Sequence, residues 1–139
     1  MRLAVLVLSS LVATAAHAQK AQPLTERQAG FLHGMAAEMQ AMLRHDHARK
    51  GHGTTYREPR VVFDRNRRQI VVVNRFHRNP KASVRRALKR SMPDRQPNLC
   101  LAFQSPTVRA TGVTIVLRAE MRSGSPIASV RASADLCPL

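Results

Sequence analysis

Three histidines and an aspartate around residue 45 are the residues best suited to hold a metal ion. His45, Asp46 and His47 are consecutive, and His52 follows shortly after. Imidazole and carboxylate groups bind zinc, copper and nickel. Residues two apart on a helix point in different directions, so joint binding by His45, His47 and His52 requires the helix to have ended there. The alternative is that these histidines only complement the dipole at a helix C-terminus.

Arginine and lysine gather in two groups that suit anion binding, a polar turn and one face of a predicted helix. The chain has 23 Lys and Arg against 8 Asp and Glu, a net charge of +15. Paired hydrogen bonds from Arg match phosphate oxygens, and such a charge attracts polyanions such as DNA or lipopolysaccharide. If both groups project from one side, they form an anion-binding surface; the alternative is an arginine-rich composition on a solvated surface. The residues are Arg65, Arg67, Arg68, Lys81, Arg85, Arg86, Lys89 and Arg90.

The sequence lacks the short motifs of common enzyme classes. It contains no GxSxG, HExxH, P-loop or GxGxxG pattern, and its eight acidic residues form no evident acid–base pair. One Tyr, four Phe and no Trp leave few aromatic rings on which single-stranded nucleic acid could stack. We therefore expect a binding protein without enzymatic activity, cofactor or sequence-specific reading of nucleic acid. Its expected partner is another protein or an anionic component of the cell envelope.

The N-terminus has the pattern of a secretory signal peptide. Arg2 precedes a mostly apolar run over residues 3–16, and positions 16–18 read Ala-His-Ala. The run is shorter than the roughly 20 residues of a membrane span. We predict that residues 1–18 are removed and that residues 19–139 form one domain in the periplasm or outside the cell, with no transmembrane segment. The alternative is a helix that stays buried in the folded protein.

The two cysteines of the chain are Cys100 and Cys137. In an oxidising compartment, an even count with one possible pairing predicts a disulfide between them. Closing a loop of this size contributes about 3–4 kcal/mol, mainly by restricting the unfolded chain. The alternative is a redox-active or metal-bound pair of thiols, but the two residues do not have CxxC spacing.

A helix is predicted to start the mature domain. Thr25 and Gln28 fit a capping box, in which each side chain satisfies the other residue's backbone N–H. Apolar residues then recur at helical spacing. They are Phe31, Leu32, Met35, Ala36, Met39, Met42 and Leu43. This methionine-rich stripe either packs on a sheet or lines a groove that adapts to different partners.

Two predicted strand pairs follow, with helices between them. Residues 54–63 and 70–76 flank a polar turn, and residues 113–121 and 127–134 flank a turn with glycine. Asn79 and Pro80 are predicted to open the second helix, and Ser105 a short helical turn. The expected order is helix, strand, strand, helix, short helix, strand, strand. This order favours an α+β domain with an antiparallel sheet and the helices on one face.

The region of residues 60–137 has an arrangement that recurs in small exported bacterial domains. A Cys is followed by a short helical stretch with an Arg, a Gly, a strand, a turn with Gly, a last strand and a closing Cys. The corresponding residues are Cys100, Arg109, Gly112, Gly124 and Cys137. In this pattern the chain resembles the quorum-sensing-regulated virulence factor group. The resemblance implies an exported binding domain closed by the disulfide, and it supplies no catalytic residues.

Overall fold

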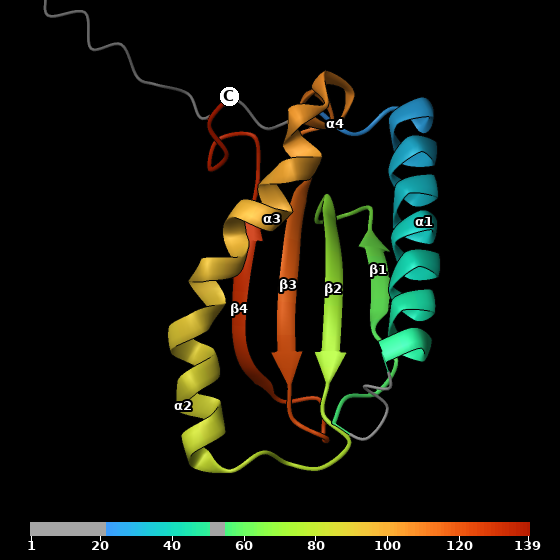
Figure 1. The fold of residues 1–139 in the computed structure, drawn as a ribbon. Helices are drawn as coiled ribbons and strands as arrows, with labels where there is room; N and C mark the ends of the chain where they lie inside the picture. Colours follow the sequence, from blue (N-terminus) through green and yellow to red (C-terminus); the bar gives the residue numbers. More distant parts are fainter. Residues whose placement is uncertain (1–21, 51–54) are drawn as a thin grey trace, which may run out of the picture.

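The computed structural model describes residues 22–50 and 55–139. The predicted signal peptide, its cleavage site and His52 lie outside these residues. The described residues form a four-stranded sheet with helices packed against it (Figure 1). This is the α+β domain that the sequence predicts.

The first helix, α1 (Glu26–Lys50), begins with the predicted capping box. The backbone N–H of Thr25 donates to Gln28 Oε1, and the backbone N–H of Gln28 donates to Thr25 Oγ1, both at 3.1 Å. The helix continues past the last apolar residue of its stripe. Asp46 supports this last part, because it forms ion pairs with Arg49 and Lys50 one turn later.

The sheet consists of β1 (Arg60–Asp64), β2 (Gln69–Arg75), β3 (Thr114–Glu120) and β4 (Pro126–Ala132), in that spatial order. The two predicted hairpins are confirmed, since β1–β2 and β3–β4 are both antiparallel. The central pair, β2 and β3, is parallel. The expectation of an antiparallel sheet is therefore wrong, and the sheet is mixed.

The parallel pair results from a long helical connection, residues 82–110, which we call the helical arm. A parallel pair needs a crossover that returns the chain to the starting end of the first strand. The arm provides this return, because it leads from the end of β2 along β4 to the start of β3 (Figure 1). Its segments are α2 (Ala82–Ser91), η2 (Met92–Arg95), α3 (Gln96–Cys100), η3 (Leu101–Gln104) and α4 (Pro106–Ala110). The element order thus has more helical segments than predicted, because prolines near the starts of η2, α3 and α4 divide the arm.

The two predicted caps of the arm have different outcomes. Ser105 caps α4 as expected, since its Oγ accepts the backbone N–H of Val108 at 3.4 Å. Asn79 does not cap α2, which begins at Ala82 after Lys81. The Oδ1 atom of Asn79 instead accepts the backbone N–H of Arg122 at 3.0 Å. This tertiary contact ties the start of the arm to the β3–β4 turn.

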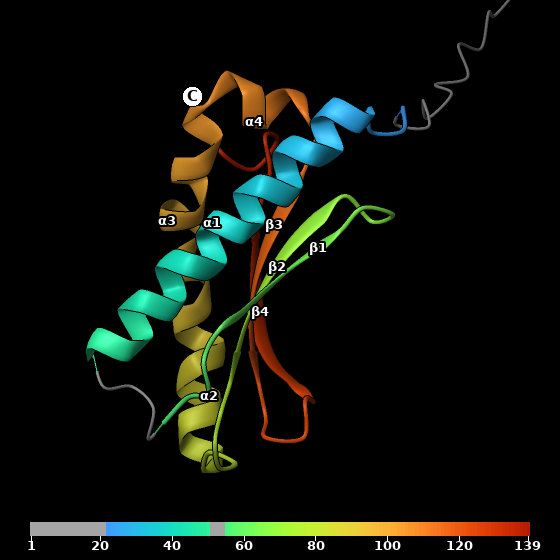
Figure 2. The ribbon, with the colours of Figure 1, turned by 90° about the vertical axis from the view of Figure 1, so that its right-hand side faces the viewer.

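The described helices α1, α2 and α3 lie on one face of the sheet, as predicted (Figures 1 and 2). Helix α1 packs along the edge strand β1, and the arm packs along the other edge strand, β4. The buried core lies toward the end where β2 and β3 begin, and it includes Leu32, Ile70 and Phe103. Among the described residues, no helix is long and apolar enough to cross a membrane.

The predicted disulfide is present and joins Cys100, at the end of α3, to Cys137, beyond β4. Arg109 reinforces the same junction. Its guanidinium donates to the backbone carbonyls of Phe103 and Cys137 at 3.2 Å and of Ala134 at 2.9 Å. The arginine of the recurring pattern thus has a structural role, because it binds the arm to the C-terminal segment.

Candidate binding groove

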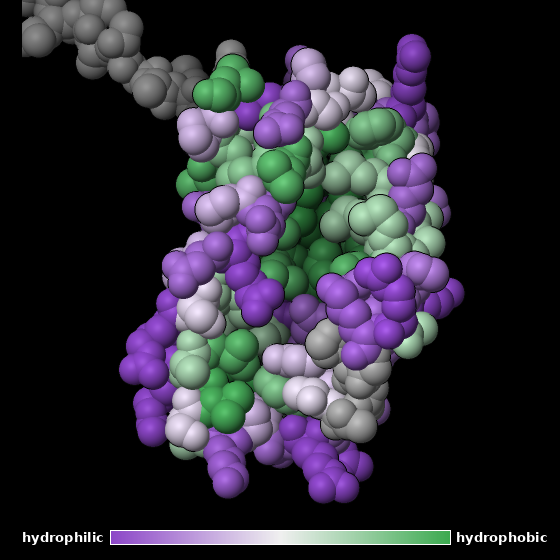
Figure 3. Space-filling model, viewed as in Figure 1, coloured by the Kyte–Doolittle hydropathy of each residue, from purple (hydrophilic) through white to green (hydrophobic). Residues whose placement is uncertain are grey.

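A groove of about 310 Å³ lies over the sheet between α1 and the helical arm. Its floor consists of Asn74 on β2 and of Leu117 and Ala119 on β3. Figure 3 shows a hollow with apolar surface between α1 and the arm, with hydrophilic side chains on both sides. The groove forms because the two walls stand over the edge strands and leave the central strands between them.

Glutamine side chains hold both walls of the groove against the sheet. Gln40 on α1 donates through Nε2 to the carbonyl of Pro59 and accepts the backbone N–H of Val61 at Oε1, both at 2.7 Å. On the arm, Gln96 Nε2 donates to the carbonyl of Arg131 on β4 at 2.9 Å. These contacts satisfy backbone groups on or next to the edge strands, and they attach both walls of the groove to the sheet.

Polar side chains from four separate elements line this groove. His47 comes from α1, Tyr56 from the segment before β1, Asn74 from β2 and Arg95 from η2. The Tyr56 ring packs against Phe76, with ring centroids 4.4 Å apart. Within residues 22–50 and 55–139, none of the four side chains forms a hydrogen bond or an ion pair with the protein. Their donors and acceptors are therefore available to a ligand.

The apolar part of the lining comes from both walls and from the floor. Leu43 belongs to α1, Leu88 and Met92 belong to the arm, and Leu117 and Ala119 form the floor. An apolar hollow with a few converging polar groups is the usual form of a ligand site. The groove therefore suits a ligand that has an apolar body and hydrogen-bonding oxygens.

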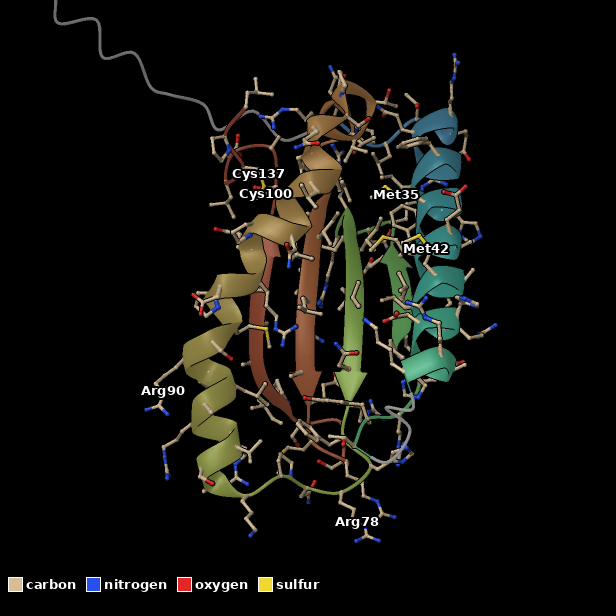
Figure 4. The ribbon with its side chains drawn as sticks, viewed as in Figure 1. Met35, Met42, Arg78, Arg90, Cys100 and Cys137 are labelled. Atoms are coloured by element: carbon tan, nitrogen blue, oxygen red, sulfur yellow. A yellow bond between two sulfur atoms is a disulfide. The ribbon has the colours of Figure 1, made fainter. Side chains whose placement is uncertain are left out.

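The sequence allows two roles for the methionine-rich stripe of α1, packing on the sheet and lining a groove, and the structure places residues in both. Leu32 and Ala36 are buried against the sheet. Phe31 and Met42 remain exposed, by 39% and 68%, and Met35 and Met39 are half-buried. Figure 4 shows Met35 on the side of α1 that faces the arm. Met35 and Met39 thus pack against the core together with Leu32 and Ala36, and Leu43 is the stripe residue that lines the groove.

The two predicted basic groups lie at opposite ends of the sheet. The turn with Arg65, Arg67 and Arg68 joins β1 to β2 near the start of α1. Helix α2 begins at the other end, beside β4 (Figures 1 and 2). The single surface that would combine both groups does not form.

The turn arginines contact other groups of the protein. Arg65 forms an ion pair with Glu26 at 2.5 Å, and Arg67 lies 3.8 Å from Asp64. Arg68 has a positive φ of 53° and donates to the carbonyls of Thr111 and Gln22. The hydrogen bond and the charge of Arg65 lower the pKa of Glu26, and the same contacts with Glu26 raise the pKa of Arg65. These arginines therefore stabilise the fold locally.

Helix α2 keeps most of its positive charge free. Arg85 donates to the carbonyl of Pro80 at 2.8 Å. The other predicted cations are exposed and form no ion pair within the described part of the chain. Arg78, which sequence reasoning missed, lies at the same end of the molecule, and Arg90 points outward from α2 (Figure 4). We call this set, namely Arg78, Lys81, Arg86, Lys89 and Arg90, the α2 cation face.

The predicted metal ligands do not come together among the described residues. His45 is exposed, whereas His47 lines the groove, as their spacing on one helix requires. His52, the third predicted ligand, lies outside the described residues. Within the described ranges, no group of three or more His, Cys, Asp or Glu residues is placed to hold a metal ion.

Of the residues that line the groove, the sequence analysis singles out Leu43 in the methionine-rich stripe and Asp46 and His47 in the candidate metal cluster. Asn74 could have been recognised from the sequence. It is a polar residue on the same face of the strand as the apolar residues Ile70 and Val72, which are buried. No sequence pattern pointed to Arg95 or Tyr56. The position of Arg95 depends on the path of the arm, and that of Tyr56 depends on its contact with Phe76. No family model, curated protein or solved structure matches the chain. The resemblance to the virulence factor group stays a prediction.

Proposed function

We propose that this chain is an exported, non-catalytic binding protein that holds its ligand in the groove between α1 and the helical arm. The observation that carries the proposal is that the polar side chains of His47, Tyr56, Asn74 and Arg95 line one groove together with apolar residues such as Leu117. Four separate elements supply these side chains, and no hydrogen-bond or ion-pair partner within the described residues occupies them. Uncompensated polar groups beside buried apolar surface favour binding of a ligand that satisfies both.

Two observations support export. The leader of residues 1–18 has the form of a signal peptide. The disulfide between Cys100 and Cys137 supports an oxidising compartment, because cytosolic thiols are kept reduced. On this basis we assign the protein to the periplasm or the extracellular space.

The arrangement of the groove favours binding over catalysis. Nucleophilic catalysis needs a nucleophile within hydrogen-bond reach of a base that a third group orients. In the described structure, His47 forms no hydrogen bond with another side chain of the groove. Asp46, the carboxylate nearest in sequence, is paired with Arg49 and Lys50.

An alkyl probe with one negative charge, octyl sulfate, tests the proposal by calorimetry. We expect one molecule to bind to the oxidised, folded protein of residues 19–139. The variant Leu117→Gln makes the groove floor polar and should weaken this binding at least fivefold. Leu136→Gln, at an exposed site outside the groove, should leave it unchanged. Equal binding by wild type and Leu117→Gln, or no binding by the folded protein, would contradict the proposal.

The α2 cation face supports a second candidate function, binding of a polyanion. Residues 78–90 contain six Lys and Arg and no Asp or Glu. If such binding is specific, reversing Arg86, Lys89 and Arg90 to Glu should weaken binding to lipopolysaccharide or DNA and flatten its dependence on salt. The matched control reverses Arg27, Arg49 and Arg67 to Glu, which changes the net charge equally on other elements. An equal loss in both variants would mean that only the total charge matters.

A further inference from the structure

We propose that the ligand of the groove is a medium-chain acyl carboxylate, with its carboxylate at Arg95 and its chain over Leu117. This inference rests on the proposed function and specifies the ligand of the same site. It follows from three properties of the groove: the sign of its unmatched charge, the hydrogen-bonding groups beside that charge, and the size of its apolar space.

The unmatched charge of the groove is positive. Asp46 Oδ1 lies 3.3 Å from Lys50 Nζ and 3.7 Å from Arg49 Nη2, so two cations of its own helix compensate this carboxylate. Arg95, on the opposite wall, forms no ion pair among the described residues, and its side chain is exposed to the hollow. One free guanidinium matches a ligand with a single negative charge, whereas a phosphate dianion would require further cations.

The hydrogen-bonding groups of the groove suit a carboxylate as well. Arg95 presents N–H donors in a planar fork that fits two oxygens of one group. Asn74 on the floor and Tyr56 at the side add an amide and a hydroxyl donor. A carboxylate can accept hydrogen bonds from guanidinium, amide and hydroxyl donors, whereas an alcohol lacks the negative charge and an ammonium group lacks acceptors.

The apolar space fits a short chain. The groove volume of about 310 Å³ lies at the lower end of the roughly 300–1,000 Å³ of ligand pockets. It therefore suits a ligand as small as octanoate. The apolar lining includes Met92 of the arm beside Leu43 and Leu88. Because methionine side chains adapt to irregular shapes, this lining favours a flexible acyl chain over a rigid ring.

The test compares three probes of equal chain length, octanoate, 1-octanol and octylamine, by calorimetry and by backbone amide shifts of the folded protein. We expect octanoate to bind one to one and to shift the amides of Asn74 and Leu117. Octanol and octylamine should bind at least tenfold more weakly. Arg95→Gln should weaken the binding of octanoate at least tenfold. Arg90→Gln removes the same charge from an outward position of the arm and should change the affinity for octanoate less than twofold.

Different results separate this inference from the proposed function. If octanol binds as tightly as octanoate and Arg95→Gln has no effect, the carboxylate assignment is wrong but the groove remains the binding site. If Arg90→Gln weakens octanoate binding as much as Arg95→Gln does, octanoate is attracted by the overall positive charge, and the assignment of its carboxylate to Arg95 is also wrong. If an acidic amphipathic peptide displaces octanoate at a hundredfold lower concentration, the ligand is a polypeptide. If no probe shifts the groove amides, the proposed function itself falls.

Discussion

Gln40 and Gln96 fasten the two walls of the groove to opposite edges of the same sheet. Gln40 joins α1 to the backbone on both sides of Arg60, and Gln96 joins the arm to Arg131. Each amide contacts backbone groups that the edge strands leave without a strand partner. The groove therefore depends on two side chains that lie outside its lining.

Replacing Gln40 with Leu should lower the free energy of unfolding by about 1–3 kcal/mol, because part-buried backbone groups at Pro59 and Val61 lose their partners. The matched control is Gln104→Leu, at an exposed site whose side chain forms no hydrogen bond in the described structure; it should change stability by less than about 0.5 kcal/mol. Urea unfolding followed by circular dichroism measures both. Equal stability of the two variants would show that the Gln40 contacts contribute nothing.

Removing the disulfide by Cys100→Ser and Cys137→Ser should cost about 3–4 kcal/mol, since residues 37 apart in sequence are no longer linked in the unfolded chain. A reducing agent should have the same effect on the wild type and none on the double variant. Denaturant unfolding with and without reductant measures the change. Coinciding curves for the oxidised and reduced wild type would contradict the expected contribution.

The ion pair between Arg75 and Glu120 lies on the sheet face that no described helix covers, yet the Glu120 side chain is only 8% exposed. Arg75 Nε and Nη2 both donate to Glu120 Oε2, at 3.1 and 2.9 Å. Arg75→Met should destabilise the protein by about 3 kcal/mol, because it leaves a buried carboxylate without its main partner.

Two further variants test this explanation. The double variant Arg75→Met with Glu120→Met should recover most of the loss, since it removes both charges together. Arg118→Met is the control, because Arg118 is 3.9 Å from Glu120 and more exposed, so it should cost less than about 1 kcal/mol. Thermal unfolding of the four proteins checks the ranking. A double variant as unstable as Arg75→Met would refute the role of the unpaired charge.

The contact between Glu26 and Arg65 should make stability depend on pH in the acid range. Arg65 lowers the pKa of Glu26 in the folded protein below its ordinary value of 4.5. A lowered folded-state pKa gives stability that is present above the unfolded-state value and is lost as the pH falls through the folded-state value. Glu26→Gln should therefore be less stable than wild type at pH 7, and the difference should shrink below pH 4.5.

Comparison of unfolding temperatures at pH 7 and in acid measures this effect for wild type and Glu26→Gln. Both side chains are exposed to solvent, so we expect a small difference that added salt reduces further. A difference that stays constant across this pH range would rule out the ion pair as its source.

The sequence by itself determined the features that depend on neighbouring residues. The capping box of Thr25 and Gln28, the two hairpins and the Ser105 cap follow from local spacing, and the disulfide follows from having only two cysteines. Such features need only short-range hydrogen bonds or a single possible pairing. Local patterns also predicted that the helices share one face, because their apolar stripes have to be buried on the sheet.

The tertiary structure decided the parallel pairing of β2 with β3 and everything that depends on it. Local pattern could not show that residues 82–110 form one continuous arm, since prolines interrupt its periodicity. The register of the pair brings Asn74 next to Ala119, and the arm brings Arg95 over the same floor. A binding site made from four separate elements has no signature in local spacing, because only the packing of helices on the sheet brings those side chains together.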